Sequence, residues 1–247
     1  MLESLTSCSG CTLTLLSLDI FPQFLERTEI AYFPTISDKV EIDKVDIALV
    51  EGCVSEESQI DTLKYIRKNS TKVCALGTCA AFGGILGLSK RKKVYPISKY
   101  IDVDYIIPGC PPPINLLGNA LMNLVENKPI TLPEKNMCYS CPLKGDMNPI
   151  LSTPISRLYP SNSDFNSNNS KQECFLKRGI LCLGPVTREG CDHLCIEKRI
   201  PCEGCLGPPS KDFTSNLINF LSLIPLSNQL KRYSGIFTRF SKPILKR

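Results

Sequence analysis

Histidine is almost absent from this 247-residue sequence, which contains His193 alone. Metal sites built from several imidazole ligands are therefore excluded. Long apolar stretches are also lacking, since no uninterrupted run approaches the roughly 18 residues of a membrane-spanning helix. Acidic residues are missing from residues 228–247, which hold six lysines and arginines. The positive net charge of +5 thus comes from a basic tail, and it is no argument that the fold itself binds nucleic acid.

Cysteine, by contrast, is abundant, with 14 residues of this type. With the first of them at position 8, we expect no secretory leader and hence a reducing, cytoplasmic compartment in which disulfides are rare. Cysteines that stay reduced in such numbers are typical ligands of metals or iron–sulfur clusters. The composition therefore predicts thiolate-ligated metal centres.

Short apolar runs alternate with helix-like segments in the first half of the sequence. Continuous apolar runs such as Val45–Val50 are typical of parallel strands that are buried on both faces. The alternation predicts an α/β fold with a doubly wound parallel sheet. The expected strands are 2–5, 29–33, 45–50, 73–76 and 103–107, and the expected helices are 13–25, 55–69 with Ser55 as its N-cap, and 115–125.

Cysteines follow most of these predicted strands. Cys8 and Cys11 come after the first strand, and Cys53, Cys79 and Cys110 come after three later ones. In such sheets ligands bind beyond the carboxyl ends of the strands, so the fold would gather these thiols at one edge. A single pair of cysteines three residues apart could also be half of a zinc site or a redox pair. Their convergence favours a shared metal centre.

Helical and strand periodicity fades in the second half, beyond Lys135. Residues 161–171 are polar and of low complexity, and prolines and glycines interrupt the rest. Such a stretch buries little apolar surface and would need metal to hold it. Eight cysteines in this half suit two four-thiolate centres, and they are Cys138, Cys141, Cys174, Cys182, Cys191, Cys195, Cys202 and Cys205.

Several motifs together resemble those of NiFe-hydrogenase small subunits. They are CSGC at 8–11, GTCAAFGG at 77–84, GCPPP at 109–113, GPVTREGC at 184–191 and CEGCLGP at 202–208. The similarity is greatest to the cytoplasmic, archaeal-type branch, which includes the small subunits of deazaflavin-reducing and heterodisulfide-reductase-linked hydrogenases and the delta subunits of sulfhydrogenases. The resemblance implies a flavodoxin-like domain over residues 1–136, a cluster domain over 137–209 and a basic tail over 210–247.

The resemblance also implies three 4Fe–4S clusters and their ligands. The proximal cluster would be held by Cys8, Cys11, Cys79 and Cys110, the distal cluster by Cys138, Cys141, Cys174 and Cys182, and the medial cluster by Cys191, Cys195, Cys202 and Cys205. The chain would be a hydrogenase subunit that carries electrons and has no catalytic residues of its own. Its partners would be a large subunit with the NiFe site and a further acceptor subunit, either a flavin or an iron–sulfur protein.

Two other classes stay open from the residues alone, namely a complex-I-like subunit with one cluster and a zinc-stabilised scaffold.

Cys74, inside a predicted strand, is expected to act as a small buried apolar residue. Cys53 is expected to pack in the interior, with a role as a fifth thiol as the alternative. Glu51 is expected to support the site or relay protons, or else to cap a helix or lie in an interface. His193 is expected near the surface or beside a ligand.

Overall fold

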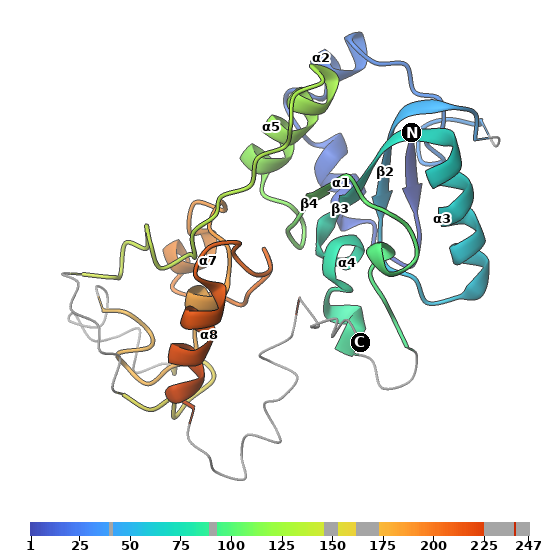
Figure 1. The fold of residues 1–247 in the computed structure, drawn as a ribbon. Coiled ribbons are helices and arrows are strands. Elements are labelled where there is room, and N and C mark those ends of the chain that lie inside the picture. Colours follow the sequence, from blue (N-terminus) through green and yellow to red (C-terminus); the bar gives the residue numbers. More distant parts are fainter. Residues whose placement is uncertain (40–41, 89–92, 146–152, 162–172, 225–239, 241–247) are drawn as a thin grey trace. The chain divides into compact units, whose positions relative to one another are not determined.

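The computed structural model describes residues 1–39, 42–88, 93–145, 153–161, 173–224 and 240. The chain divides into two compact units, the first covering Met1–Thr131 and the second beginning at Leu132 (Figure 1). The first unit contains the predicted sheet. The functional division at residues 136 and 209 stays a prediction.

A parallel sheet of four strands forms the centre of the first unit. Its strands are β1 (Leu2–Ser4), β2 (Val45–Glu51), β3 (Ser70–Leu76) and β4 (Tyr105–Ile107), in the spatial order β1-β2-β3-β4. The longest pairing joins β2 to β3, from Val45 opposite Ser70 to Glu51 opposite Leu76. Every pair is parallel, so the carboxyl ends of all four strands lie at the same edge. The predicted α/β class is confirmed.

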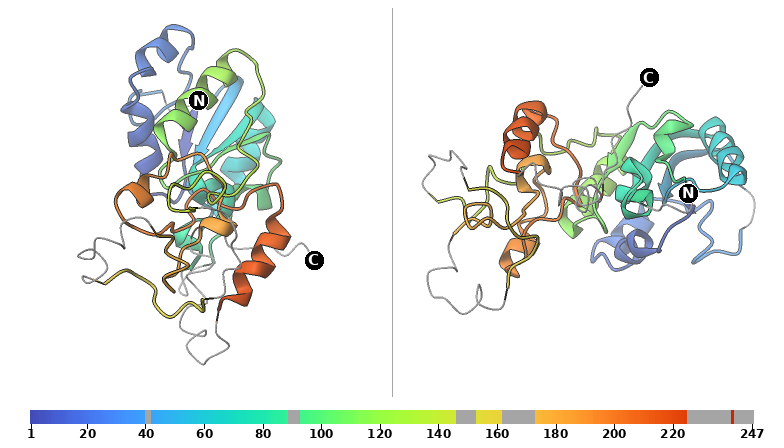
Figure 2. Two further views of the ribbon diagram at one scale, coloured as in Figure 1. Left: turned by 90° about the vertical axis from the view of Figure 1, so that its left-hand side faces the viewer. Right: turned by 90° about the horizontal axis from the view of Figure 1, so that it is seen from below.

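Helices cover both faces of the sheet (Figures 1 and 2). One face packs on α1 (Gly10–Leu16), α2 (Phe21–Glu26) and α5 (Ile114–Val125). The other packs on α3 (Glu57–Asn69), α4 (Gly77–Phe82) and the short 3-10 turn η2 (Ile97–Lys99). A second 3-10 turn, η1 (Ile85–Leu88), follows α4.

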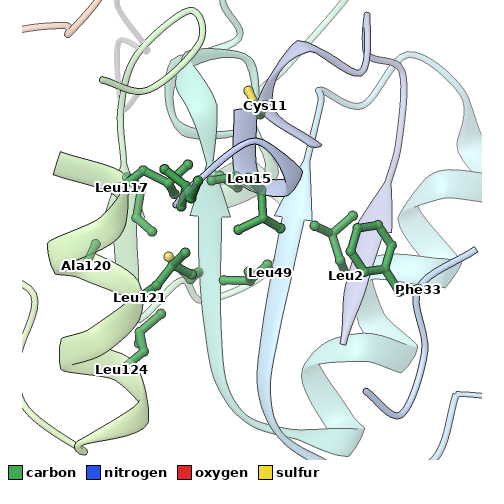
Figure 3. Close-up of a cluster of buried hydrophobic side chains, with 13 residues drawn as sticks. Leu2, Cys11, Leu15, Phe33, Leu49, Leu117, Ala120, Leu121 and Leu124 are labelled. Atoms are coloured by element: carbon green, nitrogen blue, oxygen red, sulfur yellow. The ribbon is translucent and has the colours of Figure 1, made fainter. Parts of the chain in front are cut away.

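The apolar residues of the strands alternate between these two layers. Leu49 packs with Leu15 and Leu121 on the first face (Figure 3), whereas Val50 packs with Leu63 and Ile66 on the second. Burial on both faces explains why the carboxyl-terminal parts of β2 and β3 are apolar runs. The alternation fixes the register, because a shift by one residue would exchange the two faces.

Three local predictions are wrong. Residues 29–33 form no strand, although a backbone bond from the Leu2 N–H to the Tyr32 carbonyl (2.9 Å) joins this segment to β1. The single helix expected over 13–25 is two helices, since Pro22 lacks the N–H that a continuous helix would use. The N-cap of α3 is Glu56 rather than Ser55, and Glu56 forms a capping box with Gln59.

The second unit is built from short elements and irregular chain. It contains η3 (Gly184–Val186), α7 (Leu194–Glu197) and α8 (Phe213–Ser222), which packs against η3. The guanidinium of Arg188 is largely buried and donates hydrogen bonds to the carbonyls of Pro133 (2.5 Å) and Pro208 (2.9 Å). This one side chain therefore joins three distant segments of the unit.

The basic stretch 228–247 lies outside the described residues, apart from Phe240, and so does the polar segment 162–171. Among the helices that the structure describes, none is long and apolar enough to cross a membrane.

Candidate metal centres

The sheet edge at the carboxyl ends of the strands gathers the first group of cysteines. Cys8 follows β1, Cys11 lies in the first turn of α1, Cys79 lies in α4 directly after β3, and Cys110 follows β4. Figure 3 shows Cys11 at one end of the apolar cluster, beyond Leu15. The convergence that the strand order predicted is therefore present in the fold.

Backbone contacts lock the turns that carry these thiols. The N–H of Thr78 donates to the Gly109 carbonyl (2.9 Å), and the N–H of Gly109 donates to the Thr78 hydroxyl (2.8 Å). This reciprocal pair joins the turn with Cys79 to the turn with Cys110. On the other side, residues 6 and 53 form an antiparallel bridge at the ends of β1 and β2.

Two glycines make room for the sulfur atoms. A Cβ added to Gly77 (φ 81°) would overlap the Sγ of Cys11, and one added to Gly84 (φ 56°) would lie 2.5 Å from the Sγ of Cys79. Both backbones also have a positive φ, which side chains other than glycine rarely adopt. The GTCAAFGG motif thus combines a thiol with the two glycines that let the chain approach it.

The pKa values of Cys11 and Cys79 reflect the other thiols that lie near them. Burial raises the pKa of Cys11, and Glu51, Cys79, Cys110 and Cys8 raise it further. Burial also raises the pKa of Cys79 to about 12, with added contributions from Cys53, Cys110 and Cys8. Cys11 and Cys79 therefore favour the protonated form, and a metal that binds them must displace these protons.

Glu51 is a buried carboxylate at the end of β2, with 1% of its surface exposed. It accepts hydrogen bonds from the Thr12 N–H (3.0 Å) and from the Thr12 hydroxyl. The Thr12 N–H lies in the first turn of α1, where no carbonyl within the helix is available to it. Glu51 therefore serves α1 as an external helix cap. The sequence did not predict Thr12 as the partner of Glu51, although its position directly after Cys11 places it beside the predicted site.

Two further cysteines of the first unit lie in its interior. Cys74 is fully buried in β3 within the apolar cluster, as predicted. Cys53 is also fully buried, and its thiol donates to the Thr6 carbonyl (3.4 Å). It affects the pKa of Cys79, so it lies beside the first group of cysteines.

In the second unit, the predicted distal ligands surround one small cavity of about 20 Å³. Gly184 lies against two of these thiols, since a Cβ there would be 3.1 Å from the Sγ of Cys138 and 3.6 Å from that of Cys182. Cys202, predicted as a medial ligand, also lines the cavity. Its N–H donates to the Sγ of Cys182 (3.3 Å), so the two predicted groups meet there.

The predicted medial ligands are the third group of cysteines, and two of them, Cys191 and Cys195, lie beside or within α7. Burial raises the pKa of Cys195, and the nearby Cys191 and Glu203 raise it further. Cys205 affects the pKa of Cys202, after the larger effects of burial and Cys182. His193 is the N-cap of α7, and its Nε2 lies 3.2 Å from the Met137 carbonyl, to which it donates.

Backbone N–H groups point at several sulfurs of the second unit. Although burial dominates and raises the pKa of Cys182, hydrogen bonds from the N–H groups of Gly184 and Cys202 oppose it. Those of His193 and Leu194 likewise oppose the effect of burial on the pKa of Cys191. Donors of this kind stabilise thiolates and tune iron–sulfur clusters. The residues present fit the donor set of such clusters.

No group of three or more His, Cys, Asp or Glu side chains within the described ranges is arranged to hold a single metal ion. In a 4Fe–4S cluster each thiolate binds a different iron, so the four sulfurs need not surround one atom.

Known proteins similar to this chain align with nearly its whole length, and a family model matches its first half. The family model described as NADH ubiquinone oxidoreductase, 20 Kd subunit, matches residues 8–124. The G subunit of the F420-non-reducing hydrogenase vhu from Methanococcus voltae is 31% identical, over 98% of this chain and 94% of its own length. The delta subunit of Sulfhydrogenase 2 from Pyrococcus furiosus is 30% identical, over 96% of this chain and 97% of its own.

A similar fold is found in a recombinant [NiFeSe] hydrogenase from Desulfovibrio vulgaris Hildenborough. The TM-score is 0.57 at 20% identity, and the match covers 87% of this chain and 94% of that one. It extends beyond the sheet into the cysteine-rich second unit.

Proposed function

The chain belongs to the family of NiFe-hydrogenase small subunits, and we propose from this premise that it relays electrons through three 4Fe–4S clusters. It is a subunit of an oxidoreductase that acts on hydrogen as part of a complex. The other ends of the relay are a large subunit with the NiFe site and an acceptor subunit that carries a flavin or an iron–sulfur cluster. The proposed location is the cytoplasm.

The gathering of four thiols at the edge of the parallel sheet carries this proposal. They come from separate turns, and Gly77 and Gly84 remove the side chains that would block two of them. When bound, 4Fe–4S clusters carry single electrons at potentials set by burial, charge and hydrogen bonds to sulfur. The proposed ligands of the proximal cluster are Cys8, Cys11, Cys79 and Cys110.

The exposure of these thiols suits an interface with a large subunit. Cys11 is buried and Cys79 is half-buried, whereas Cys8 and Cys110 are exposed. The inner pair thus belongs to the core, and the outer pair lies on the surface of the first unit. A partner that covers the outer pair would exclude water from the site, which strengthens electrostatic effects on the potential.

Eight cysteines of the second unit support the other two clusters. Cys138, Cys141, Cys174 and Cys182 line one small cavity, and the N–H groups directed at Cys182 and Cys191 suit thiolate ligands. The grouping into distal and medial sets follows the resemblance in sequence.

Metal analysis of the anaerobically purified chain tests the proposal. Three clusters predict about twelve iron and about twelve acid-labile sulfide per chain. The variant Cys79→Ala should lose about four iron, together with hydrogen-dependent dye reduction by the assembled complex. Cys74→Ala removes a buried thiol outside the groups, and it should keep both.

The alternatives give different results. A complex-I-like subunit is suggested by the family model over residues 8–124, and it would hold about four iron. A zinc-stabilised scaffold would be colourless and contain zinc in place of iron. Either result would contradict the proposed relay of three clusters.

A further inference from the structure

An open cavity of about 680 Å³ in the second unit reaches the proposed distal ligands from the surface. Cys138, Cys141 and Cys174 all line it. Together with the small cavity behind them, it leaves these thiols between the interior of the unit and this opening. A cluster held there would thus lie close to any molecule that occupies the cavity.

The charge of the cavity is one-sided. Its charged lining residues are four lysines and one aspartate, namely Lys135, Lys144, Lys177, Lys211 and Asp212. They come from separate stretches of the chain, so the fold and not a local run of sequence creates the positive surface. Residues 1–227 as a whole are close to neutral, which makes this concentration of lysine distinctive.

An exposed aromatic ring lies among these lysines. Tyr139 has 56% of its surface exposed and also lines the cavity. The Nζ of Lys135 lies 3.1 Å from the centre of its ring, and the Nζ of Lys144 lies 3.4 Å from its carbonyl oxygen. These contacts hold two of the four charges beside the cysteines. Exposed tyrosines in well-ordered settings are common anchors of protein interfaces.

We propose that this cavity is the docking surface for an acidic electron-acceptor protein, whose carboxylates surround its redox centre and face the four lysines. The inference rests on the proposed function, because it requires electrons to leave the chain here. Hydrogen is the reductant, and each H2 yields two protons and two electrons. Two molecules of an acceptor that takes one electron are therefore reduced for each H2.

Complementary charge acts mainly on the rate of encounter, and salt screens it. The test uses this chain assembled with the large subunit, in the absence of the acceptor subunit, and two small probe acceptors, a plant-type ferredoxin, which is acidic, and mitochondrial cytochrome c, which is basic. The double variant Lys177→Glu/Lys211→Glu reverses two exposed lysines and leaves those that touch Tyr139 in place. The matched control is Lys44→Glu/Lys93→Glu, at exposed positions of the first unit.

At low ionic strength the cavity variant should reduce ferredoxin roughly tenfold more slowly than the parent, and cytochrome c at least as fast. The difference should disappear at about 0.5 M salt, where the Debye length is only a few ångströms. The control variant should stay within about twofold of the parent for both acceptors.

Equal losses for both acceptors, or a loss in the control variant as large as that in the cavity variant, would overturn the docking surface. Unchanged ferredoxin reduction by the cavity variant would overturn it as well. If tripolyphosphate then inhibits the cavity variant less than the parent, the lysines bind a small anion instead. The proposed function has its own check in the parent complex. If the parent fails to reduce a small uncharged dye with hydrogen, the relay itself is wrong, whatever the lysines do.

Discussion

At the scale of single residues, the first cysteine group depends on what lies next to each sulfur. The order of the cysteines along the sequence predicted their convergence, because parallel strands place their carboxyl ends at one edge. The role of Gly77 could not be predicted from the sequence, because its positive φ and its close approach to Cys11 are properties of the folded chain. The hydrogen bonds of Glu51 were hidden for the same reason, because they join residues 39 positions apart.

Substitution of Gly77 by alanine should empty the proximal site. The new Cβ would overlap the Sγ of Cys11, and the chain should lose about four iron. Gly145→Ala is the matched control, because Gly145 also has a positive φ (65°) but no atom within 4 Å of an added Cβ. Both variants carry the backbone cost of roughly 1–2 kcal/mol, so iron content separates steric overlap from strain. Full iron in Gly77→Ala would show that the two residues are not in contact.

Substitution of Cys195 by alanine tests the third group. If Cys191, Cys195, Cys202 and Cys205 hold one cluster, three thiolates remain and one iron loses its anchor. Electron paramagnetic resonance of the oxidised variant should then show a 3Fe–4S signal that is absent from the parent. Leu194→Ala, at an exposed neighbouring position of α7, should leave the spectrum unchanged. A parent-like spectrum in Cys195→Ala would remove Cys195 from the ligands.

At the scale of elements, the two central strands could be predicted best. Both β2 and β3 combine a largely apolar run with burial on both faces, and they lie where that pattern placed them. Helix boundaries were less accessible, because Pro22 divides one apolar stretch into α1 and α2. The helix α8 was not predicted, since its packing against η3 depends on a chain path that periodicity does not reveal.

The bond between α1 and β2 should contribute measurably to stability. Thr12→Val removes the hydroxyl donor from the buried Glu51 carboxylate and should cost about 1–3 kcal/mol. That cost corresponds to a fall in Tm of roughly 2–10 °C, measured by circular dichroism under anaerobic conditions. Thr62→Val removes an exposed bond to the Ser58 carbonyl within α3, and it should change Tm by less than about 2 °C. An equal fall in both variants would mean that the Thr12–Glu51 bond has no special weight.

At the scale of the whole molecule, the two units have different sources of order. The first unit contains two apolar clusters, one on each face of its sheet. The second joins short helices through irregular chain and carbonyl bonds to Arg188. The loss of periodicity after Lys135 predicted this contrast. The path of the second unit could not be predicted, because it depends on contacts between segments far apart in the sequence, such as the bonds of Arg188, rather than on a repeating pattern.

Removal of iron should therefore affect the units unequally. A strong iron chelator should unfold the segment 138–209 and leave a folded sheet, because the first unit is built on a regular sheet with an apolar cluster on each face, whereas the described part of the second consists of short elements and irregular chain. Hydrogen exchange read by mass spectrometry should show lost protection around Cys174–Cys205 and retained protection in β2 and β3. Apo protein that loses protection equally in both units would contradict this division.

The sheet of the first unit also differs from the second unit in when it can be completed. Its last helix, α5, ends at Val125, and all four cysteines at the sheet edge precede that helix. Domains fold as units during synthesis, the N-terminal one first. When the ribosome has added the few dozen residues that carry α5 out of its tunnel, the proximal site is complete, although the cysteines near α7 have not yet emerged. On the proposed ligand assignment, the nascent chain would offer cluster-delivery proteins one finished site at a time, and the thiols of the later groups would not compete for the first iron delivered.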